Sequence, residues 1–214
     1  MSLSKYRYVV VEGPIGVGKT SLAQRLAGQI GAQLLLEKPQ DNPFLERFYK
    51  DQARYALPTQ LFFLFQRINE VRDLAQLDMF NARTVSDYLF EKDRLFAKLT
   101  LDEEEFKLYQ SIFQSLALQA PQPDLVIYLQ ASTDVLLERI QRRGLKYERT
   151  ITADYLAKLS GIYGEFFHHF DAAPLLVVNS DNLNFVDQAE DFELLLEKIG
   201  KMKGAREYFN VGRD

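Results

Sequence analysis

The chain has no cysteine and no tryptophan, and only two of its 214 residues are histidine. Without cysteine it can form no disulfide bond, no thiolate metal site and no cysteine nucleophile. The two histidines, His168 and His169, are adjacent in a Phe-rich segment instead of lying four residues apart. We therefore expect them to pack or to lie at an interface, and not to bind a metal.

Long apolar runs and an excess of positive charge are also missing. No apolar run reaches the roughly 18 residues that a membrane-spanning helix needs. The formal net charge of -4 argues against a nucleic-acid-binding surface. A first strand is expected from about Tyr6, which leaves no room for a signal peptide. These absences predict a soluble, cytoplasmic protein with neither a membrane nor a nucleic-acid partner.

A phosphate-binding loop is the most informative feature that is present. Residues 13–20 match the pattern G-x-x-x-x-G-K-[ST], between a strand-like and a helical segment. In such a loop the backbone N–H groups bind a polyphosphate, Lys19 reaches the β- and γ-phosphates, and the Thr20 hydroxyl holds Mg²⁺. The residues expected to bind a nucleoside triphosphate are Gly13, Pro14, Ile15, Gly16, Val17, Gly18, Lys19 and Thr20.

Short apolar runs alternate with helical segments along the chain. Strands are expected at 6–12, 33–37, 83–87, 124–130 and 175–179, and helices at 18–30, 43–51, 59–81, 89–99, 103–119, 133–143, 152–171 and 184–200. This alternation predicts an α/β fold, a three-layer sandwich of the P-loop NTPase type with a five-stranded parallel sheet. We expect one domain over residues 1–200, with a lid at about 140–151 and a polar C-terminal tail at 201–214.

Three acidic residues lie at or near the carboxyl ends of the expected strands, where parallel α/β sheets bind ligands: Glu37, Asp87 and Asp181. Phosphoryl transfer to an alcohol needs a metal ligand and a base. Asp87 has the position of a Walker-B-type acid. An arginine-rich segment from Arg139 to Arg149 is predicted to be a short lid that brings positive charge to the transferring phosphoryl group.

In their order and spacing, these motifs resemble the deoxynucleoside kinase family, especially its bacterial deoxyadenosine/deoxyguanosine kinase branch. The resemblance covers roughly residues 6–198. Its motifs are the loop at 13–20, Glu37-Lys38-Pro39, Asn42-Pro43-Phe44-Leu45, Phe48-Tyr49, Pro58-Thr59-Gln60 running to Arg67, Val85-Ser86-Asp87, Arg139 to Arg143-Gly144, Asp154-Tyr155-Leu156 and Val178-Asn179-Ser180-Asp181.

The resemblance implies an activity, cofactors and an assembly. The activity is ATP- and Mg²⁺-dependent phosphorylation of the 5′-hydroxyl of a deoxynucleoside in nucleotide salvage, with deoxyadenosine or deoxyguanosine favoured over deoxycytidine. The assembly is a homodimer formed through the helices 59–81 and 103–119. The wide apolar surface of these two helices fits a dimer interface and a double-sided core equally well.

The resemblance also implies a role for each matched side chain. The residues implied to act in catalysis are Glu37 as the general base and Lys19, Arg139 and Arg143 as cations. Those implied to bind the nucleoside are Glu37, Tyr49, Gln60, Arg67, Phe96 and Glu148. Those implied to bind Mg²⁺ are Thr20 and Asp87, and those implied to lie near the adenine of ATP are Ser180, Asp181 and Asn182.

Within the nucleoside-binding group, each side chain has an implied partner. Tyr49 and Glu148 hold the 3′-hydroxyl of the sugar. Gln60 pairs with the edge of the base, because its amide offers both a donor and an acceptor. Arg67 helps to read the base, and Phe96 stacks on it.

One departure from the family pattern concerns Tyr88. Family members usually have arginine after the acid at the end of the third strand, and here Tyr88 follows Asp87. In an active kinase we expect another cation to replace that arginine near the 5′-oxygen, either Lys38 or Arg94, with Lys38 favoured because it adjoins Glu37.

Two points therefore stay open at this stage. Either Lys92 or Asp93 takes the position of the acid that reads the base, so the base preference is undecided. Two other functions are also compatible with the phosphate-binding loop. A thymidylate-like nucleoside-monophosphate kinase would need an arginine where Tyr88 stands, and a degenerate nucleotide-binding protein with little turnover would explain Tyr88.

Overall fold

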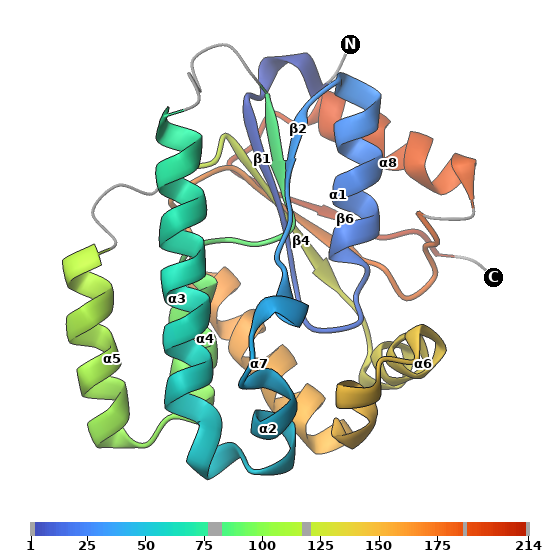
Figure 1. Ribbon diagram of the computed structural model, residues 1–214. Helices are drawn as coiled ribbons and strands as arrows, with labels where there is room; N and C mark the ends of the chain where they lie inside the picture. The colour runs from blue at the N-terminus through green and yellow to red at the C-terminus, as the bar shows by residue number, and fades with distance from the viewer. Residues whose placement is uncertain (1–2, 77–82, 117–120, 186–187, 213–214) are drawn as a thin grey trace.

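In the computed structural model, the described parts of the chain are residues 3–76, 83–116, 121–185 and 188–212, and for Ser4 and residues 71–76 the backbone alone is described. The strands are β1 (Tyr8–Glu12), β2 (Gln33–Leu35), β3 (Thr84–Ser86), β4 (Leu125–Gln130), β5 (Leu175–Asn179) and β6 (Arg206–Phe209). They form one parallel sheet in the order β2-β3-β1-β4-β5-β6 (Figure 1). The predicted three-layer α/β fold is confirmed.

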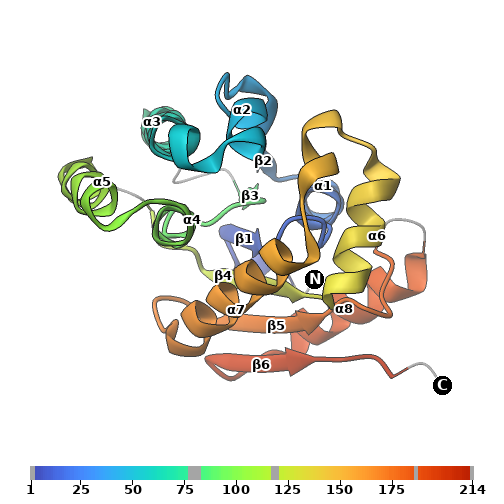
Figure 2. The same ribbon diagram turned by 90° about the horizontal axis from the view of Figure 1, so that it is seen from below.

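The helices cover both faces of this sheet. They are α1 (Lys19–Ile30), α2 (Leu45–Lys50), α3 (Gln52–Gln76), α4 (Lys92–Thr100), α5 (Glu103–Leu116), α6 (Thr133–Arg143), α7 (Ala153–His169) and α8 (Ala189–Lys201). Short 3-10 helices lie at Leu3–Lys5, Pro39–Asp41 and Lys146–Thr150. Figures 1 and 2 show α1 and α8 on one face of the sheet and α4 and α7 on the other, with α3 and α5 beyond α4. Parts of the predicted helices 59–81, 103–119 and 184–200 lie outside the described residues.

The two faces of the sheet bury separate apolar clusters. Val9 and Val11 pack in the cluster that contains α1 and α8 residues such as Leu22 and Leu195. Val10, between them in the strand, packs in the cluster on the other face with residues of α4 and α7. Successive side chains of a strand point to opposite faces. A strand that is apolar on both faces is therefore typical of a parallel sheet with helices on both sides.

The prediction of five strands was wrong. Arg206–Phe209 adds a sixth strand, which pairs in parallel with β5 and lies within the range predicted as a polar tail. The strand was not predicted because its sequence has no apolar run. It lies at the edge of the sheet, where polar contacts help to hold it. The Glu207 carboxylate accepts a hydrogen bond from Lys198 at 2.7 Å, and the Arg206 guanidinium donates one to the Phe170 carbonyl oxygen at 2.7 Å.

Helix α3 begins at Gln52, earlier than the predicted start at residue 59, and Pro58 lies inside it. Proline lacks an N–H donor, which is why the sequence favours a helix start at this point. In the structure Ala56 is buried in a cluster with Leu45 and Phe48 of α2. Packing against α2 therefore holds the turns before the proline in helical form.

None of the helices within the described ranges combines the length and the apolar character that crossing a bilayer requires.

Candidate functional site

The phosphate-binding loop joins β1 to α1 below the lower ends of these two elements in Figure 1. Gly13 and Gly16 have φ angles of +153° and +86°. A Cβ atom would lie 2.4 Å from the Leu129 carbonyl oxygen at Gly13 and 2.8 Å from the Leu136 carbonyl oxygen at Gly16. Both backbone conformation and space therefore demand glycine at these two positions.

Lys19 lies inside this loop. Its ammonium group donates hydrogen bonds to the carbonyl oxygens of Gly13 at 2.8 Å and Pro14 at 3.2 Å. Burial and the positive charge of Lys92 lower the pKa of Lys19 to about 8. The group is thus predominantly charged at neutral pH, and an anion in the loop would strengthen its hold on the proton.

The buried carboxylate of Glu12 links the start of the phosphate-binding loop to α7 and to the segment after β3 by hydrogen bonds. One oxygen of its carboxylate accepts hydrogen bonds from the Gly13 N–H at 2.8 Å and from the Tyr163 hydroxyl at 3.0 Å. The other accepts one from the Leu89 N–H at 2.8 Å. Sequence reasoning missed this residue, although an acid at the end of an apolar strand, directly before the first glycine, was a usable signal.

Asp87 directly follows β3 and contacts residues that follow the two neighbouring strands, β1 and β2. Its carboxylate accepts hydrogen bonds from the Thr20 hydroxyl at 2.5 Å and from the Glu37 N–H at 2.7 Å. Hydroxyl and carboxylate oxygens beside a phosphate-binding loop are ligands that suit Mg²⁺. No group of three or more His, Cys, Asp or Glu in the described ranges could hold a metal ion. Thr20 and Asp87 therefore fit a metal whose other ligands are phosphate oxygens and water.

A first cavity, with an empty volume of about 870 Å³ that includes open solvent, lies beside the loop. Its lining includes all six residues predicted to bind the nucleoside: Glu37, Tyr49, Gln60, Arg67, Phe96 and Glu148. They come from β2's end, α2, α3, α4 and the segment Lys146–Thr150. These residues are spread along the sequence from Glu37 to Glu148, and the fold brings them together around one cavity.

Two cations contact Glu37 within the cavity. The Arg67 guanidinium forms ion pairs with both Glu37 and Asp93, and the Lys92 ammonium lies 2.9 Å from the other Glu37 oxygen. Burial raises the pKa of Glu37, but the positive charges of Lys92, Arg67 and Lys19 outweigh it and hold the pKa at about 2. Glu37 is therefore ionised at neutral pH and able to accept a proton.

Of Lys92 and Asp93, the two residues between which the sequence left the base-reading position open, Asp93 forms an ion pair with Arg67. Its role in reading the base stays a prediction. Its Oδ2 atom and the Arg67 Nε atom are buried, and neither has a hydrogen-bond partner among the described residues. Two unpaired polar atoms at such depth are costly unless a ligand satisfies them.

Tyr88 does not line the cavity. It is buried, its hydroxyl donates a hydrogen bond to Glu70 at 2.7 Å, and its ring centre lies 5.2 Å from the Arg67 guanidinium carbon. The two cations expected to replace the family's arginine also lie elsewhere. Lys38 is exposed, and Arg94 stacks over the Phe113 ring, so neither lines the cavity. The expectation that Lys38 takes this place was wrong, since Lys92 is the lysine that contacts Glu37.

A second cavity lies on the other side of the loop, with an empty volume of about 1620 Å³ that includes open solvent. Among the predicted cofactor-binding residues, those that line it are Gly16, Val17, Gly18, Lys19, Thr20, Asp181 and Asn182. Ile15 lines the first cavity instead, and Gly13, Pro14 and Ser180 line neither. The arginines along α6, Arg139, Arg142 and Arg143, line its other wall.

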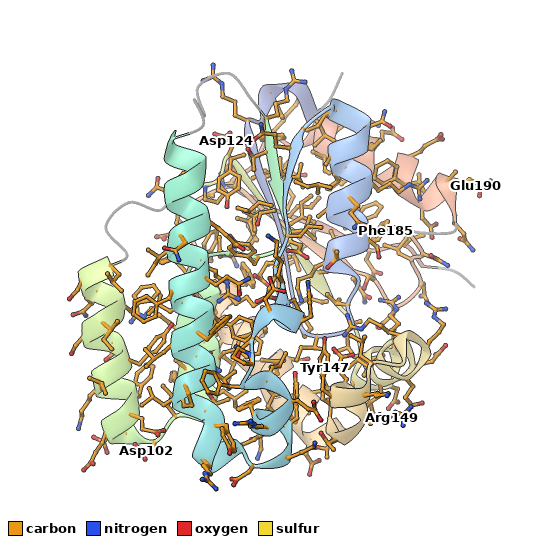
Figure 3. All side chains as sticks on the ribbon, viewed as in Figure 1. Asp102, Asp124, Tyr147, Arg149, Phe185 and Glu190 are labelled. Carbon is orange, nitrogen blue, oxygen red and sulfur yellow. The ribbon has the colours of Figure 1, made fainter. Side chains whose placement is uncertain are left out.

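The two arginines predicted to be catalytic make different contacts. Arg139 donates hydrogen bonds to the carbonyl oxygens of Ser180 at 2.7 Å and Val17 at 3.2 Å, so it ties the loop after β5 to the phosphate-binding loop. Arg143 binds the buried Glu148 carboxylate through two hydrogen bonds, at 2.5 and 3.0 Å. Both roles in catalysis stay predictions. Figure 3 labels Tyr147, the residue directly before Glu148 in the chain, in the lower half of the molecule.

Comparison with known proteins identifies relatives over nearly the whole chain. The family model described as "Deoxynucleoside kinase" matches residues 9–203. The chain is 31% identical to a deoxyguanosine kinase of Bacillus subtilis over 91% of this chain and 97% of that protein. It is 32% identical to a deoxyadenosine kinase of Lactobacillus acidophilus, over 89% of this chain and 94% of that protein.

The fold comparison agrees with these relatives. The structure of a deoxyadenosine kinase from M. mycoides with bound dCTP superimposes with a TM-score of 0.77 at 24% sequence identity, covering 91% of this chain and 100% of that one. The structure of the same enzyme with bound dATP superimposes with a TM-score of 0.76 at 22% identity, with the same coverage. These similarities concern the fold.

Proposed function

The chain belongs to the deoxynucleoside kinase family, and from this premise we propose that it transfers the γ-phosphate of ATP, with Mg²⁺, to the 5′-hydroxyl of a purine deoxynucleoside. One observation carries the assignment of the two cavities. The residues that line both of them are Gly16, Lys19, Thr20 and Arg143. A triphosphate in the second cavity and an alcohol in the first would therefore meet at the phosphate-binding loop.

Glu37 is the proposed general base. Two cations hold its carboxylate in the ionised form, and it lines the first cavity with Lys19 and Asp87. A carboxylate with so low a pKa is a weak base. Phosphoryl transfer through a loose transition state asks for little base strength, and positioning and charge supply most of the acceleration.

Thr20 and Asp87 are the proposed residues for Mg²⁺. When bound, the ion would neutralise charge on the β- and γ-phosphate oxygens. The chain itself orients the groups. The Asp87 carboxylate also accepts a hydrogen bond from the Glu37 N–H, which places the proposed metal ligand beside the proposed base.

Specificity for the nucleoside is assigned to the far end of the first cavity. Arg67 Nε and Asp93 Oδ2 offer one donor and one acceptor that a base edge would satisfy, and the Gln60 amide, whose nitrogen donates to Thr100 at 3.3 Å, adds another pair. A purine offers complementary atoms on its edge. The names of the two relatives at 31% and 32% identity, a deoxyguanosine kinase and a deoxyadenosine kinase, also favour a purine. Tyr49 and Glu148 are assigned to the 3′-hydroxyl.

Dimer formation and a cytoplasmic role in nucleotide salvage complete the proposal. Phe65 on α3 and Leu108 on α5 are 50% and 51% exposed. Both helices lie on the side of the molecule away from β5 and β6 (Figure 2). Apolar side chains exposed on these two helices support an interface between two copies. Sedimentation of the wild type and of Phe65→Glu tests this part, since the charged variant is expected to be a monomer.

A substrate screen tests the catalytic proposal. The purified chain is incubated with ATP, Mg²⁺ and each of the four deoxynucleosides, and in parallel with the four deoxynucleoside monophosphates. Formation of 5′-monophosphates from deoxyadenosine or deoxyguanosine is the expected result. Turnover of the monophosphates alone would assign a nucleoside-monophosphate kinase. ATP binding without turnover of any acceptor would assign a degenerate nucleotide-binding protein.

A further inference from the structure

Lys92 is a buried lysine whose contacts point at the reacting centre. It is the first residue of α4, and 4% of its surface is exposed. Its ammonium group lies 2.9 Å from Glu37 Oε2 and 5.5 Å from the centre of the Phe96 ring. It lines the first cavity together with Lys19, Thr20 and Asp87, and its positive charge contributes to lowering the pKa of Lys19 in the phosphate-binding loop.

The two arginines of the cavity are bound mainly by protein carboxylates, although the Arg67 Nε atom has no partner among the described residues. Arg67 is held between two carboxylates, those of Glu37 and Asp93, and its faces are covered by the Phe63 and Tyr88 rings. Arg143 binds Glu148 through two hydrogen bonds. These guanidinium groups are committed to holding protein side chains in place.

Lys92 differs from them in its remaining donors. An ammonium group has three N–H donors. Within the described parts of the chain, the Glu37 carboxylate is the one acceptor bound by the Lys92 side chain. A buried ammonium that keeps unused donors and lines an open cavity is suited to bind an anion there.

The charge balance of the cavity also calls for an anion. Lys19 and Lys92 come from different elements, the start of α1 and the start of α4, and both line this cavity. Two ammonium groups in one partly dehydrated space repel each other. A group with negative oxygens between them would turn that repulsion into two attractions, and the transferring phosphoryl group carries its charge on three such oxygens.

We propose that Lys92 is a catalytic residue, which binds the transferring phosphoryl group on the acceptor side while it holds the Glu37 carboxylate toward the acceptor hydroxyl. This inference rests on the proposed function, with Glu37 as the base. In the step, the bond from the 5′-oxygen to the γ-phosphorus forms and the bond from that phosphorus to the β–γ bridging oxygen breaks. The hydroxyl proton passes to Glu37, and Lys92 keeps its protons throughout.

The first experiment compares Lys92→Met, which keeps the length of the side chain and removes its charge, with Lys92→Arg. Lys98→Met is the matched control, because Lys98 is exposed on the same helix. Removing one donor from a developing charge typically lowers kcat by about 100-fold or more, which is the loss expected for Lys92→Met. The KM for the deoxynucleoside should change by less than about fivefold, Lys92→Arg should keep more activity than Lys92→Met, and Lys98→Met should equal wild type.

A second experiment separates phosphoryl binding from mere support of Glu37. In a Glu37→Gln background, adding Lys92→Met should slow single-turnover phosphorylation by about tenfold or more again. A lysine that acts through Glu37 alone would cause no further loss. As a binding readout, ADP and Mg²⁺ are titrated with the deoxynucleoside present, with and without aluminium fluoride, a mimic of the transferring group. Lys92→Met should lose the gain in affinity that fluoride produces and keep the affinity for ADP alone.

The outcomes separate this inference from the proposed function. Absence of deoxynucleoside phosphorylation in the wild type would remove the proposed function itself. A wild type that is active, with Lys92→Met matching Lys98→Met, would overturn the role of Lys92 and leave the kinase assignment intact. Loss of ADP binding in both Lys92 variants would also overturn it, because Lys92 would then be a structural residue.

Discussion

The hydroxyl of Thr20 donates a 2.5 Å hydrogen bond to the carboxylate of Asp87, 67 residues further along the chain. The contact exists because β1 and β3 are neighbours, with Val10 paired with Ser86. Asp87 directly follows β3, and the loop after β1 leads to Thr20 in the first turn of α1. Two hard oxygen ligands are thereby set side by side next to the phosphate-binding loop.

Replacing Asp87 with asparagine should raise the Mg²⁺ requirement of the kinase. The amide keeps the shape of the side chain but removes the negative charge that attracts the ion. We expect the Mg²⁺ concentration for half-maximal activity to rise by about tenfold or more, corresponding to about 1.4 kcal/mol at 25 °C. Activity is measured across a Mg²⁺ titration at saturating ATP. An unchanged half-maximal concentration in Asp87→Asn would remove Asp87 from the metal site.

Lys19→Ala should abolish ATP-dependent phosphorylation and leave the fold intact. The Lys19 ammonium contacts the carbonyl oxygens of Gly13 and Pro14 and is a charge for the phosphates, not a part of the apolar core. Turnover is measured together with thermal unfolding. Near-normal turnover in a variant that unfolds like wild type would contradict the assignment of the loop.

The pKa of Lys19 adds a pH signature to the same prediction. Burial and Lys92 lower the pKa of Lys19 to about 8, so part of the population is neutral above that pH. Phosphates favour the charged form, and ATP binding should therefore take up protons at about pH 8.5 and weaken as the pH rises further. Calorimetric titrations in two buffers with different ionisation enthalpies measure this uptake. Lys19→Ala should bind ATP weakly and without this proton uptake.

Glu37→Gln should lower kcat by about 100-fold or more, with a smaller effect on the KM for the deoxynucleoside, because the shape is kept and the proton acceptor is lost. Steady-state kinetics with deoxyadenosine and deoxyguanosine measure both constants. A loss that lay wholly in KM would make Glu37 a binding residue and require another base.

Acid unfolding provides a second check on Glu37. The pKa of its carboxyl is lowered from 4.5 to about 2 by Lys92 and Arg67, in spite of burial. The stabilisation is therefore fully present above the unfolded-state value of 4.5 and is lost as the pH falls toward about 2. The free energy of unfolding of the wild type should decline through this interval more steeply than that of Glu37→Gln. Equal slopes would mean that Glu37 is not held by these charges.

The kinase should favour a 2′-deoxyribose over a ribose. The buried Glu148 carboxylate is held by Arg143, and the Tyr49 ring stacks on Tyr147 with centres 6.1 Å apart, so both groups proposed for the 3′-hydroxyl have fixed positions. Tyr49 would crowd an added 2′-hydroxyl. We expect kcat/KM for deoxyadenosine to exceed that for adenosine by about tenfold or more. Equal values for the two nucleosides would contradict this arrangement.

Features that depend on a few consecutive residues were predictable from the sequence. The phosphate-binding loop is one, because its glycines, its lysine and its threonine act through local backbone geometry. Glu37 and Asp87 were also predictable, since the carboxyl ends of parallel strands meet at one edge of a sheet. The family resemblance supplied the other cavity residues, which the fold brings together.

Other features depended on how distant elements pack. The edge strand β6 forms by backbone pairing with β5, and its sequence has no apolar pattern from which it could be predicted. Lys92, the first residue of α4, meets Glu37 across 55 residues of sequence, because the packing of α4 against α3 and α7 places this residue at the first cavity. Each residue of a helix turns about 100° from the last, so its direction follows from the helix start and its packing.

The sequence by itself thus determined the class of fold, the triphosphate loop and the acids at the strand ends, because each follows from local chemistry and a general rule of parallel sheets. The tertiary structure alone decided which cations contact the proposed base: Arg67 and Lys92, and neither Lys38 nor Arg94. A side chain on a helix reaches the cavity only if the packed helix presents the face that carries it. That choice is made by burial against α3 and α7, which no short stretch of sequence encodes.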